Sequence, residues 1–203
     1  MSNSIILSAS YLPPISYFHA ISKNEGDIVL DKYEHFPKQT YRNRTRIATA
    51  NGVLDLIVPI QHGRQERIAM KDVKINYDHD WQRLHWLSIQ TAYRSSPYFE
   101  FYEDEFRPFY ENKYELLFDF NEMQLQLILK CLKLKRTIAY TEKFEKEYPE
   151  ALDLRHVIHP KKESLLPSPK PYYQLFEERN GFLPDLSVLD LIFNQGPQSK
   201  NYL

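Results

Sequence analysis

A strand, a helix and a second strand follow one another at the start of the chain. Residues 5–9 form a short apolar run that ends in small residues, which is typical of a buried strand, and Pro13-Pro14 stops it. Residues 16–22 have apolar side chains at helical spacing before Gly26, and residues 27–31 predict a second strand. This order predicts a parallel pair. We therefore predict an α/β fold with a central, at least partly parallel sheet, flanking helices and an irregular Pro-rich C-terminal segment.

The carboxyl ends of the two strands are followed by polar side chains. Ser10 and Tyr11 follow the first strand, and Asp31 and Glu34 follow the second. Parallel α/β sheets bind ligands at this edge, so we expect the hydroxyls to point into a cleft. The two carboxylates are candidates for proton transfer or for holding a metal ion. Alternatively, they are partners for nearby arginines.

Residues 38–47 carry four cations and no carboxylate. The Asn51-Gly52 turn signal predicts a hairpin between residues 44–49 and 54–60. Side chains alternate along a strand, so Arg42, Arg44 and Arg46 should share one face, which favours a bound anion or facing carboxylates. Guanidinium groups suit carboxylate or phosphate, although three solvated arginines on a hairpin edge are the alternative. The predicted ligand-binding residues are Ser10, Tyr17, Gln39, Tyr41, Arg42, Asn43, Arg44 and Trp81.

Further helices are expected downstream. One helix should span residues 81–93 with Asp78 or Asp80 as its N-cap, and another should start at 100–105 and break at Pro108. The strongest apolar stripe predicts a helix over residues 121–136, and a last helix covers 186–193. A strand is predicted over residues 68–75.

His85 lies on the first of these helices, four residues after Trp81. Imidazole titrates near neutral pH, so His85 is a candidate general acid or base, and we group it with Tyr11 and Asp31 as the candidate catalytic residues. The alternative is a core histidine that hydrogen-bonds to the backbone.

Length and composition favour one domain. The chain has 203 residues, of which 42% are hydrophobic, and a net charge of -1. We predict a single domain over residues 1–203, with an α/β body at 1–148 and a Pro-rich wrap with a terminal helix at 149–203. Six of the 13 prolines fall between Pro149 and Pro184.

Several classes of function are disfavoured. Near-neutral charge argues against nucleic-acid binding, and we expect a soluble cytoplasmic protein because no signal peptide or apolar span of about 20 residues is present. The five isolated glycines exclude a Gly-rich phosphate loop or dinucleotide motif. Cys131 is expected to be a buried, inert thiol. No metal site is predicted, and the pattern names no cofactor and no oligomeric state.

Motifs along nearly the whole chain resemble the WbqC-like protein family. Many members begin the first motif with Gln-Pro, where this chain has Ala9-Ser10. The matching motifs are Ser10-x-Leu12-Pro13-x2-Ser16-Tyr17-Phe18, Lys38-Gln39-x-Tyr41-Arg42-Asn43-Arg44, Val58-Pro59-Ile60, Trp81-x3-His85-Trp86, Ala92-Tyr93-x3-Pro97-Tyr98-Phe99, Tyr172-x-Gln174-x-Phe176 and Gly181-Phe182-x-Pro184-x-Leu186-Ser187-x-Leu189-Asp190-x3-Phe193-Asn194-x-Gly196-Pro197.

The resemblance implies a role in making surface polysaccharide of the O-antigen type. The expected reaction is acyl or aminoacyl transfer to an amino sugar, and the expected ligand is a small acidic molecule such as a nucleotide sugar or an acyl donor. One alternative is a non-catalytic binding or assembly protein for an acidic ligand. The other is a nucleotidyltransferase-like enzyme, in which phosphates meet the first loop and the helix start. Of the paired histidines in such enzymes, this chain has only His19.

Overall fold

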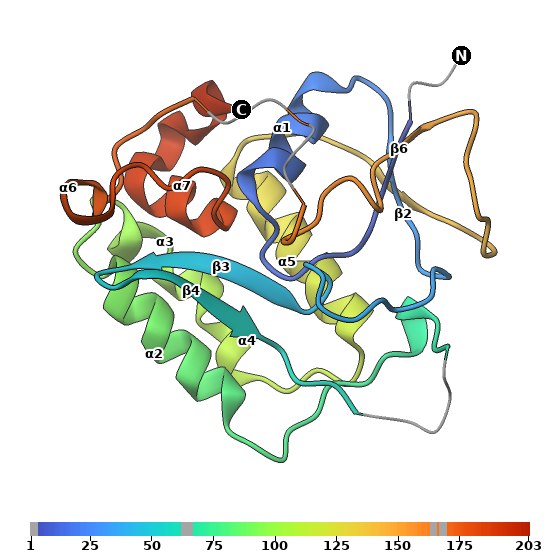
Figure 1. The fold of residues 1–203 in the computed structure, drawn as a ribbon, viewed down its shortest axis with the longest axis horizontal. Helices are drawn as coiled ribbons and strands as arrows, with labels where there is room; N and C mark the ends of the chain where they lie inside the picture. The colour runs from blue at the N-terminus through green and yellow to red at the C-terminus, as the bar shows by residue number, and fades with distance from the viewer. Residues whose placement is uncertain (1–3, 62–66, 163–165, 167–169) are drawn as a thin grey trace.

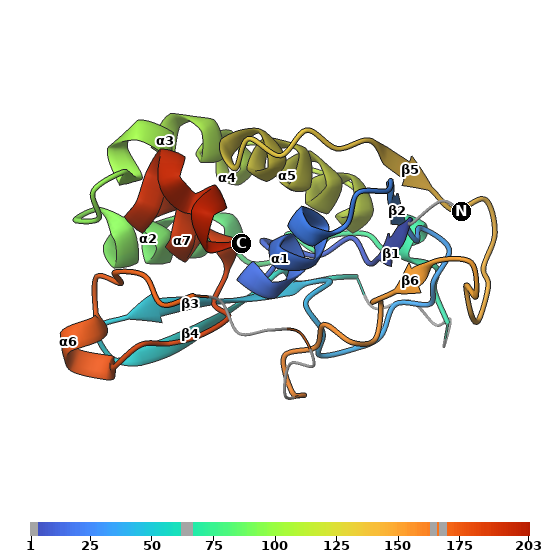
Figure 2. The same ribbon diagram turned by 90° about the horizontal axis from the view of Figure 1, so that it is seen from above.

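The computed structural model describes residues 4–61, 67–162, 166 and 170–203. Four short strands form a parallel sheet in the order β5-β2-β1-β6, at one end of the molecule (Figures 1 and 2). Every neighbouring pair in this sheet is parallel. The predicted α/β class is therefore confirmed. The strands are β1 (Ile5–Leu7), β2 (Ile28–Leu30), β5 (Ile138–Tyr140) and β6 (Leu152–Asp153).

Helix α1 (Ile15–Lys23) makes the crossover between β1 and β2, as the sequence predicts. It begins after Pro14, whose extended backbone directs the chain into the first turn. The carboxylate of Asp185 accepts hydrogen bonds from the Ser16 backbone N–H at 2.7 Å and from the Ser16 hydroxyl at 2.9 Å. A carboxylate from the C-terminal segment therefore occupies the helix start.

Strands β3 (Arg44–Thr49) and β4 (Gly52–Ile57) form the predicted antiparallel hairpin. Thr49 pairs with Gly52, and Arg46 pairs with Asp55. The turn needs a glycine because Gly52 has a φ of +101°. The hairpin lies in front of α5 in Figure 1.

Helix α2 (Trp81–Tyr93) has the predicted bounds, and Pro108 separates α3 (Phe99–Phe106) from α4 (Pro108–Glu111) as expected. Asp80 takes the N-cap position of α2 without a side-chain hydrogen bond. Helix α5 (Leu117–Cys131) starts and ends earlier than predicted, and Lys133 then takes a left-handed backbone conformation. None of the helices in the described ranges is long and apolar enough to cross a bilayer.

The predicted strand over residues 68–75 is wrong. The segment contains the 3₁₀ turn η1 (Met70–Asp72) and single bridges at Ala69, Lys74 and Ile75. Its backbone groups bond to the start of α5, where Leu117 N donates to Val73 O at 2.9 Å. The apolar residues are buried by packing against this helix, so their alternation does not reflect a ladder.

The C-terminal segment carries α6 (Glu177–Asn180), α7 (Val188–Gln195) and the 3₁₀ helix η2 (Gly196–Tyr202) between irregular stretches. Helix α7 is mostly buried, and the rings of Tyr93 and Phe99 pack on Phe193. Although β6 belongs to the segment expected to wrap the body, it forms one edge of the sheet. Figure 2 places α7 beside α1, between the hairpin and α3.

We expect Gly196→Ala to destabilise the protein by about 2 kcal/mol more than Gly52→Ala does. Both glycines have positive φ, but a Cβ on Gly196 would lie 2.4 Å from the Tyr98 ring, whereas a Cβ on Gly52 has nothing within 4 Å. Urea unfolding of the two variants measures the difference. Equal losses would mean that the ring moves aside freely.

Candidate functional site

A small cavity lies at the carboxyl edge of the parallel sheet, over the ends of β1 and β6. Its volume of about 10 Å³ has room for roughly one water molecule. The chain builds the sheet outward from β1 to β2 and β5, and then returns to the other side of β1 with β6. Ligands of parallel sheets bind where the strand order reverses in this way. The lining residues are Leu7, Ser8, Ser10, Tyr17, Arg42, Leu154, Arg155 and Ile158; we call this the sheet-edge cavity.

Arg42 is held in this cavity by a buried ion pair. Its Nε donates to Glu34 Oε1 at 2.8 Å, and its Nη2 donates to Glu34 Oε2 and to the Arg155 carbonyl. Both side chains are almost fully buried, at 3% and 4% exposure. Glu34 is therefore the partner of Arg42, as the alternative interpretation of the sequence had it.

Asp31 and Arg155 form a second buried pair beside the first. Arg155 Nη1 donates to Asp31 Oδ2 at 2.6 Å and to the Glu145 carbonyl, and its other nitrogens donate to Asp153 and to the Lys146 carbonyl. Asp31 also accepts from the Thr141 hydroxyl and from two backbone N–H groups. Its carboxylate is therefore bound on several sides, which does not favour the predicted role in proton transfer.

Three of the lining residues carry hydroxyl groups, and they come from the chain just after β1 and from α1. Tyr17 Oη donates to the Ser8 carbonyl at 3.0 Å, and Ser10 Oγ donates to the same carbonyl at 3.3 Å. Burial raises the pKa of Tyr17, so its hydroxyl stays protonated. Ser8 is 5% exposed, and its Oγ has no hydrogen-bond partner among the described residues. Ser8, which is one of the cavity-lining residues, thus carries a buried donor and acceptor without a partner among the described residues.

The three arginines of the basic run do not converge. Arg44 and Arg46 lie on one face of β3, and both reach Asp55 of β4, at 3.4 and 3.5 Å. Arg42 precedes the strand, and its side chain lies in the sheet-edge cavity. The prediction that all three share one face is correct for Arg44 and Arg46 only. Arg42 is excluded because the pairing of β3 with β4 starts at Arg44.

His85 belongs to a different, buried cluster. Its Nδ1 lies 2.9 Å from Tyr11 Oη, which in turn lies 3.0 Å from Tyr110 Oη. Burial lowers the pKa of His85 to about 4, and a hydrogen bond with the Ile57 backbone acts in the other direction. The rings of Trp81 and His85 pack edge to face. Neither His85 nor Tyr11 lines the sheet-edge cavity.

The remaining predicted residues are spread around these two clusters. Gln39 contacts Lys161, whose Nζ donates to Gln39 Oε1. Tyr41 is buried, and its carbonyl accepts from Tyr11 N. Asn43 Nδ2 donates to the Val58 carbonyl at 2.9 Å, and this hydrogen bond joins the residue before β3 to the residue after β4.

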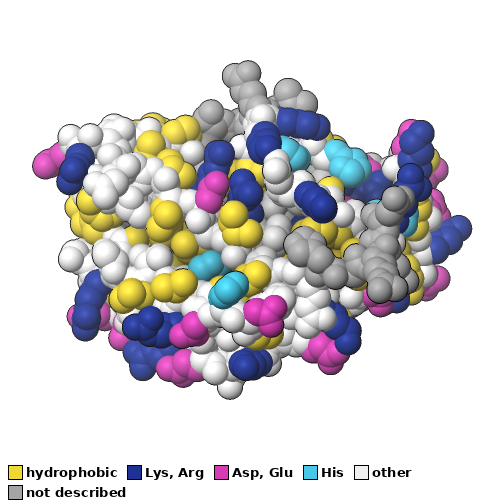
Figure 3. Space-filling model, turned by 60° about the horizontal axis from the view of Figure 1, so that its bottom comes forward, with side chains coloured by type: hydrophobic (Ala, Val, Ile, Leu, Met, Phe, Trp, Pro, Cys, Tyr) yellow, Lys and Arg dark blue, Asp and Glu magenta, His cyan; other side chains and the backbone are white. Residues whose placement is uncertain are grey.

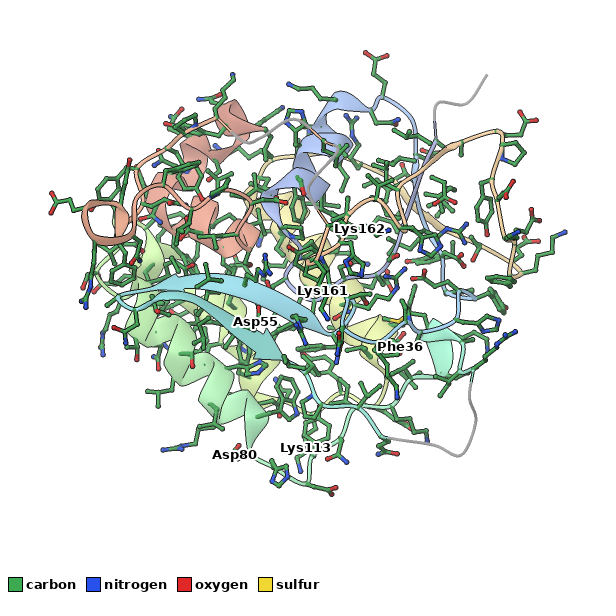
Figure 4. The ribbon with its side chains drawn as sticks, viewed as in Figure 1. Phe36, Asp55, Asp80, Lys113, Lys161 and Lys162 are labelled. Carbon is green, nitrogen blue, oxygen red and sulfur yellow. The ribbon has the colours of Figure 1, made fainter. Side chains whose placement is uncertain are left out.

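Sequence reasoning missed Ser8, Arg155 and the basic segment that follows β6. Lys161 and Lys162 lie on this segment, which crosses in front of α5 (Figures 2 and 4). On the face in Figure 3, lysine, arginine and histidine side chains gather around the upper middle of the molecule. The signal in the sequence that could have indicated this segment was the group of basic residues after residue 154. The strand before it has only two residues, so the sequence did not indicate that this group lies at the edge of the sheet.

Metal ligands and the single cysteine are the remaining groups to consider. They contain no cluster of three or more His, Cys, Asp or Glu side chains suited to a metal ion. Cys131 is buried, and its burial raises the pKa of the thiol to about 12, so it is inert as expected.

Comparison with known proteins gives one family match and one relative. The model of the WbqC-like protein family matches residues 9–162. An uncharacterised protein of Mycobacterium tuberculosis (strain ATCC 25618 / H37Rv), Rv1507c, is 25% identical over 231 residues, which cover all of this chain and 98% of the relative. No solved structure matches. The family match includes every residue that lines the sheet-edge cavity except Leu7 and Ser8.

Proposed function

Since the chain belongs to the WbqC-like protein family, we propose that it is an enzyme of surface-polysaccharide biosynthesis that binds an acidic sugar precursor at the sheet-edge cavity. The family resemblance supplies the biosynthetic context. The position of the cavity, at the carboxyl ends of β1 and β6, supports the choice of site.

The observation that carries the proposal is the unused hydroxyl of Ser8 beside two buried guanidinium groups. A buried hydroxyl without a partner costs about 1–3 kcal/mol, so a fold retains it at a cost to stability. A single oxygen of a ligand is small enough for the volume available: a sugar hydroxyl can donate to or accept from Ser8, and a carbonyl oxygen can accept from it. Arg42 and Arg155 line the same cavity, and their charges are balanced there by Glu34, Asp31 and Asp153.

Within this role, the proposed reaction is acyl or aminoacyl transfer to an amino sugar. The amine nitrogen would attack the acyl carbonyl carbon and lose a proton while the leaving group of the donor departs. A non-catalytic binding protein is the second candidate, and one observation favours it. Asp31 and Glu34 are both engaged by arginines, and His85 and Tyr11 lie in a separate buried cluster. A nucleotidyltransferase-like role has less support, because Asp185 occupies the helix start where phosphates would bind.

We expect Ser8→Ala to weaken the binding of nucleoside diphosphate amino sugars about tenfold without lowering stability. The substitution removes only a hydroxyl that the fold does not use, so the free energy of unfolding should stay unchanged or rise. Isothermal titration calorimetry with a panel of these sugars measures the affinity, and urea unfolding measures the stability.

Ser22→Ala is the matched control, because Ser22 Oγ bonds locally to the His19 carbonyl at the end of α1. It should leave the affinity unchanged. Equal affinities for Ser8→Ala and the wild type, or no binding of any sugar in the panel, would reject the proposed function. Turnover of an acyl donor by the wild type would separate the enzyme from the non-catalytic alternative.

A further inference from the structure

Four basic side chains lie on residues 156–162, which directly follow the cavity-lining residue Arg155; we call this surface the entrance of the sheet-edge cavity. Arg155 and Ile158 line the cavity itself, and the chain continues from them through His156, His159, Lys161 and Lys162. Both lysines are exposed, and neither forms an ion pair with a carboxylate of the described residues. The entrance therefore carries positive charge that the described part of the fold does not neutralise.

These side chains are close enough to influence one another. Burial lowers the pKa of His159, and the charges of Lys162, Arg42, Lys161 and His156 lower it further. Arg42 is the residue of the basic run that lines the cavity, so His159 lies within range of both the cavity and the lysines. A positive potential concentrated in this way attracts anions.

The local hydrogen bonds leave donors at the entrance. His159 Nδ1 accepts from Lys161 N at 3.1 Å, so the neutral ring carries its proton on Nε2 and can donate from there. Lys162 Nζ donates to the His156 carbonyl at 3.3 Å, which holds the ammonium beside the imidazoles and leaves it further hydrogens to donate. A group composed of acceptors only is the complement of such a site.

Gln39 supplies a side-chain acceptor to one of these donors. Its Oε1 accepts from Lys161 Nζ, and its backbone is left-handed with φ of 61°, although it is not a glycine. Left-handed backbone at such a residue is uncommon and concentrates at ligand sites. The neutral amide oxygen occupies the position that an anionic oxygen would take with a stronger, charge-assisted hydrogen bond.

We propose that Lys161, Lys162 and His159 form a phosphate site at the entrance of the sheet-edge cavity, which holds the diphosphate of the sugar precursor. This inference rests on the proposed function, which it deepens by naming the acidic group. In the bound state a phosphate oxygen replaces Gln39 Oε1 on Lys161. Lysine suits this task because its ammonium binds phosphate as a point charge.

The test uses pyrophosphate, which contains the diphosphate without a sugar. Lys161→Gln/Lys162→Gln should lower the affinity for pyrophosphate at least tenfold in calorimetry, whereas Lys130→Gln should leave it unchanged. Lys130 is also an exposed lysine, but its ammonium is paired with Glu105. Equal affinity in the double variant and the Lys130→Gln control would overturn the proposal.

A second measurement follows His159 directly. The NMR titration midpoint of its ring should rise in the wild type when pyrophosphate is bound, because the anion stabilises the imidazolium. The rise should disappear in the double variant. A midpoint that pyrophosphate does not move would overturn the role of His159.

UDP and farnesyl diphosphate serve as competitors of pyrophosphate. Displacement by UDP indicates a nucleotide-linked sugar, and displacement by farnesyl diphosphate indicates a lipid-linked sugar. Failure of both would reject a diphosphate ligand.

The phosphate site and the proposed function can fail separately. Pyrophosphate binding that depends on the two lysines, with sugar binding indifferent to Ser8→Ala, would reject the sugar precursor and retain the phosphate site. Sugar binding that depends on Ser8 but not on the lysines would retain the proposed function and reject the phosphate site.

Discussion

Replacing Arg155 with methionine is expected to lower the free energy of unfolding by about 3–5 kcal/mol. The guanidinium is 1% exposed and joins Asp31, Asp153 and the backbone of Glu145 and Lys146. Methionine fills much of the same volume but leaves the Asp31 carboxylate, which is fully buried, without its cation. The loss arises mainly from this stranded charge and less from the value of the pair itself. Urea unfolding at pH 7 measures the effect.

Two further variants test this explanation. Arg107→Met breaks exposed pairs with Glu103 and Asp104, so it should cost less than about 1 kcal/mol. Adding Asp31→Asn to Arg155→Met removes the stranded charge and should recover part of the stability. If Arg155→Met behaves like Arg107→Met, or if Asp31→Asn brings no recovery, the buried pair does not hold the sheet edge together.

Local signals in the sequence account for the elements that were predicted correctly. The βαβ unit, the hairpin at Asn51-Gly52 and both ends of α2 each depend on neighbouring residues: a strand before Pro13, a turn that tolerates positive φ, and a helix between Asp80 and Ser95. The position of Ser10 at the carboxyl edge followed from the same reasoning, and it lines the cavity.

The missed features depend on contacts between distant parts of the chain. Strand β6 has two residues, and it exists because Leu152 and Leu154 N–H groups donate to the carbonyls of Ser4 and Ile6. Arg155 follows this strand and meets Asp31, which is 124 residues away in sequence. No local pattern in the sequence predicts the pairing of Arg155 with Asp31. For the same reason, the basic run predicted a group of cations but not their partners. In the structure, Arg42 pairs with Glu34 in the sheet-edge cavity, whereas Arg44 pairs with Asp55 on the hairpin.

Two buried groups should impose opposite pH dependences on stability. Burial raises the pKa of Asp190 to about 6, although hydrogen bonds from Tyr172, Tyr93 and Gln174 act against this, whereas burial lowers the pKa of His85 to about 4. At pH values between the folded-state pKa of His85 and its ordinary pKa, the unfolded chain binds a proton on His85 and the folded chain does not. The contribution of His85 therefore raises the free energy of unfolding as pH rises. For Asp190 the folded chain binds the proton, so its term lowers stability as pH rises.

We therefore expect the two contributions, each about 3 kcal/mol, to offset one another between pH 4 and 6. His85→Gln removes one of them, so its stability relative to the wild type should fall by about 3 kcal/mol between pH 4 and pH 7. Asp190→Asn removes the other, and its relative stability should rise by about the same amount over that range. Urea unfolding at several pH values measures both differences, in which titrations common to all three proteins cancel. A His85→Gln difference that does not change with pH would mean that this imidazole is not held neutral in the fold.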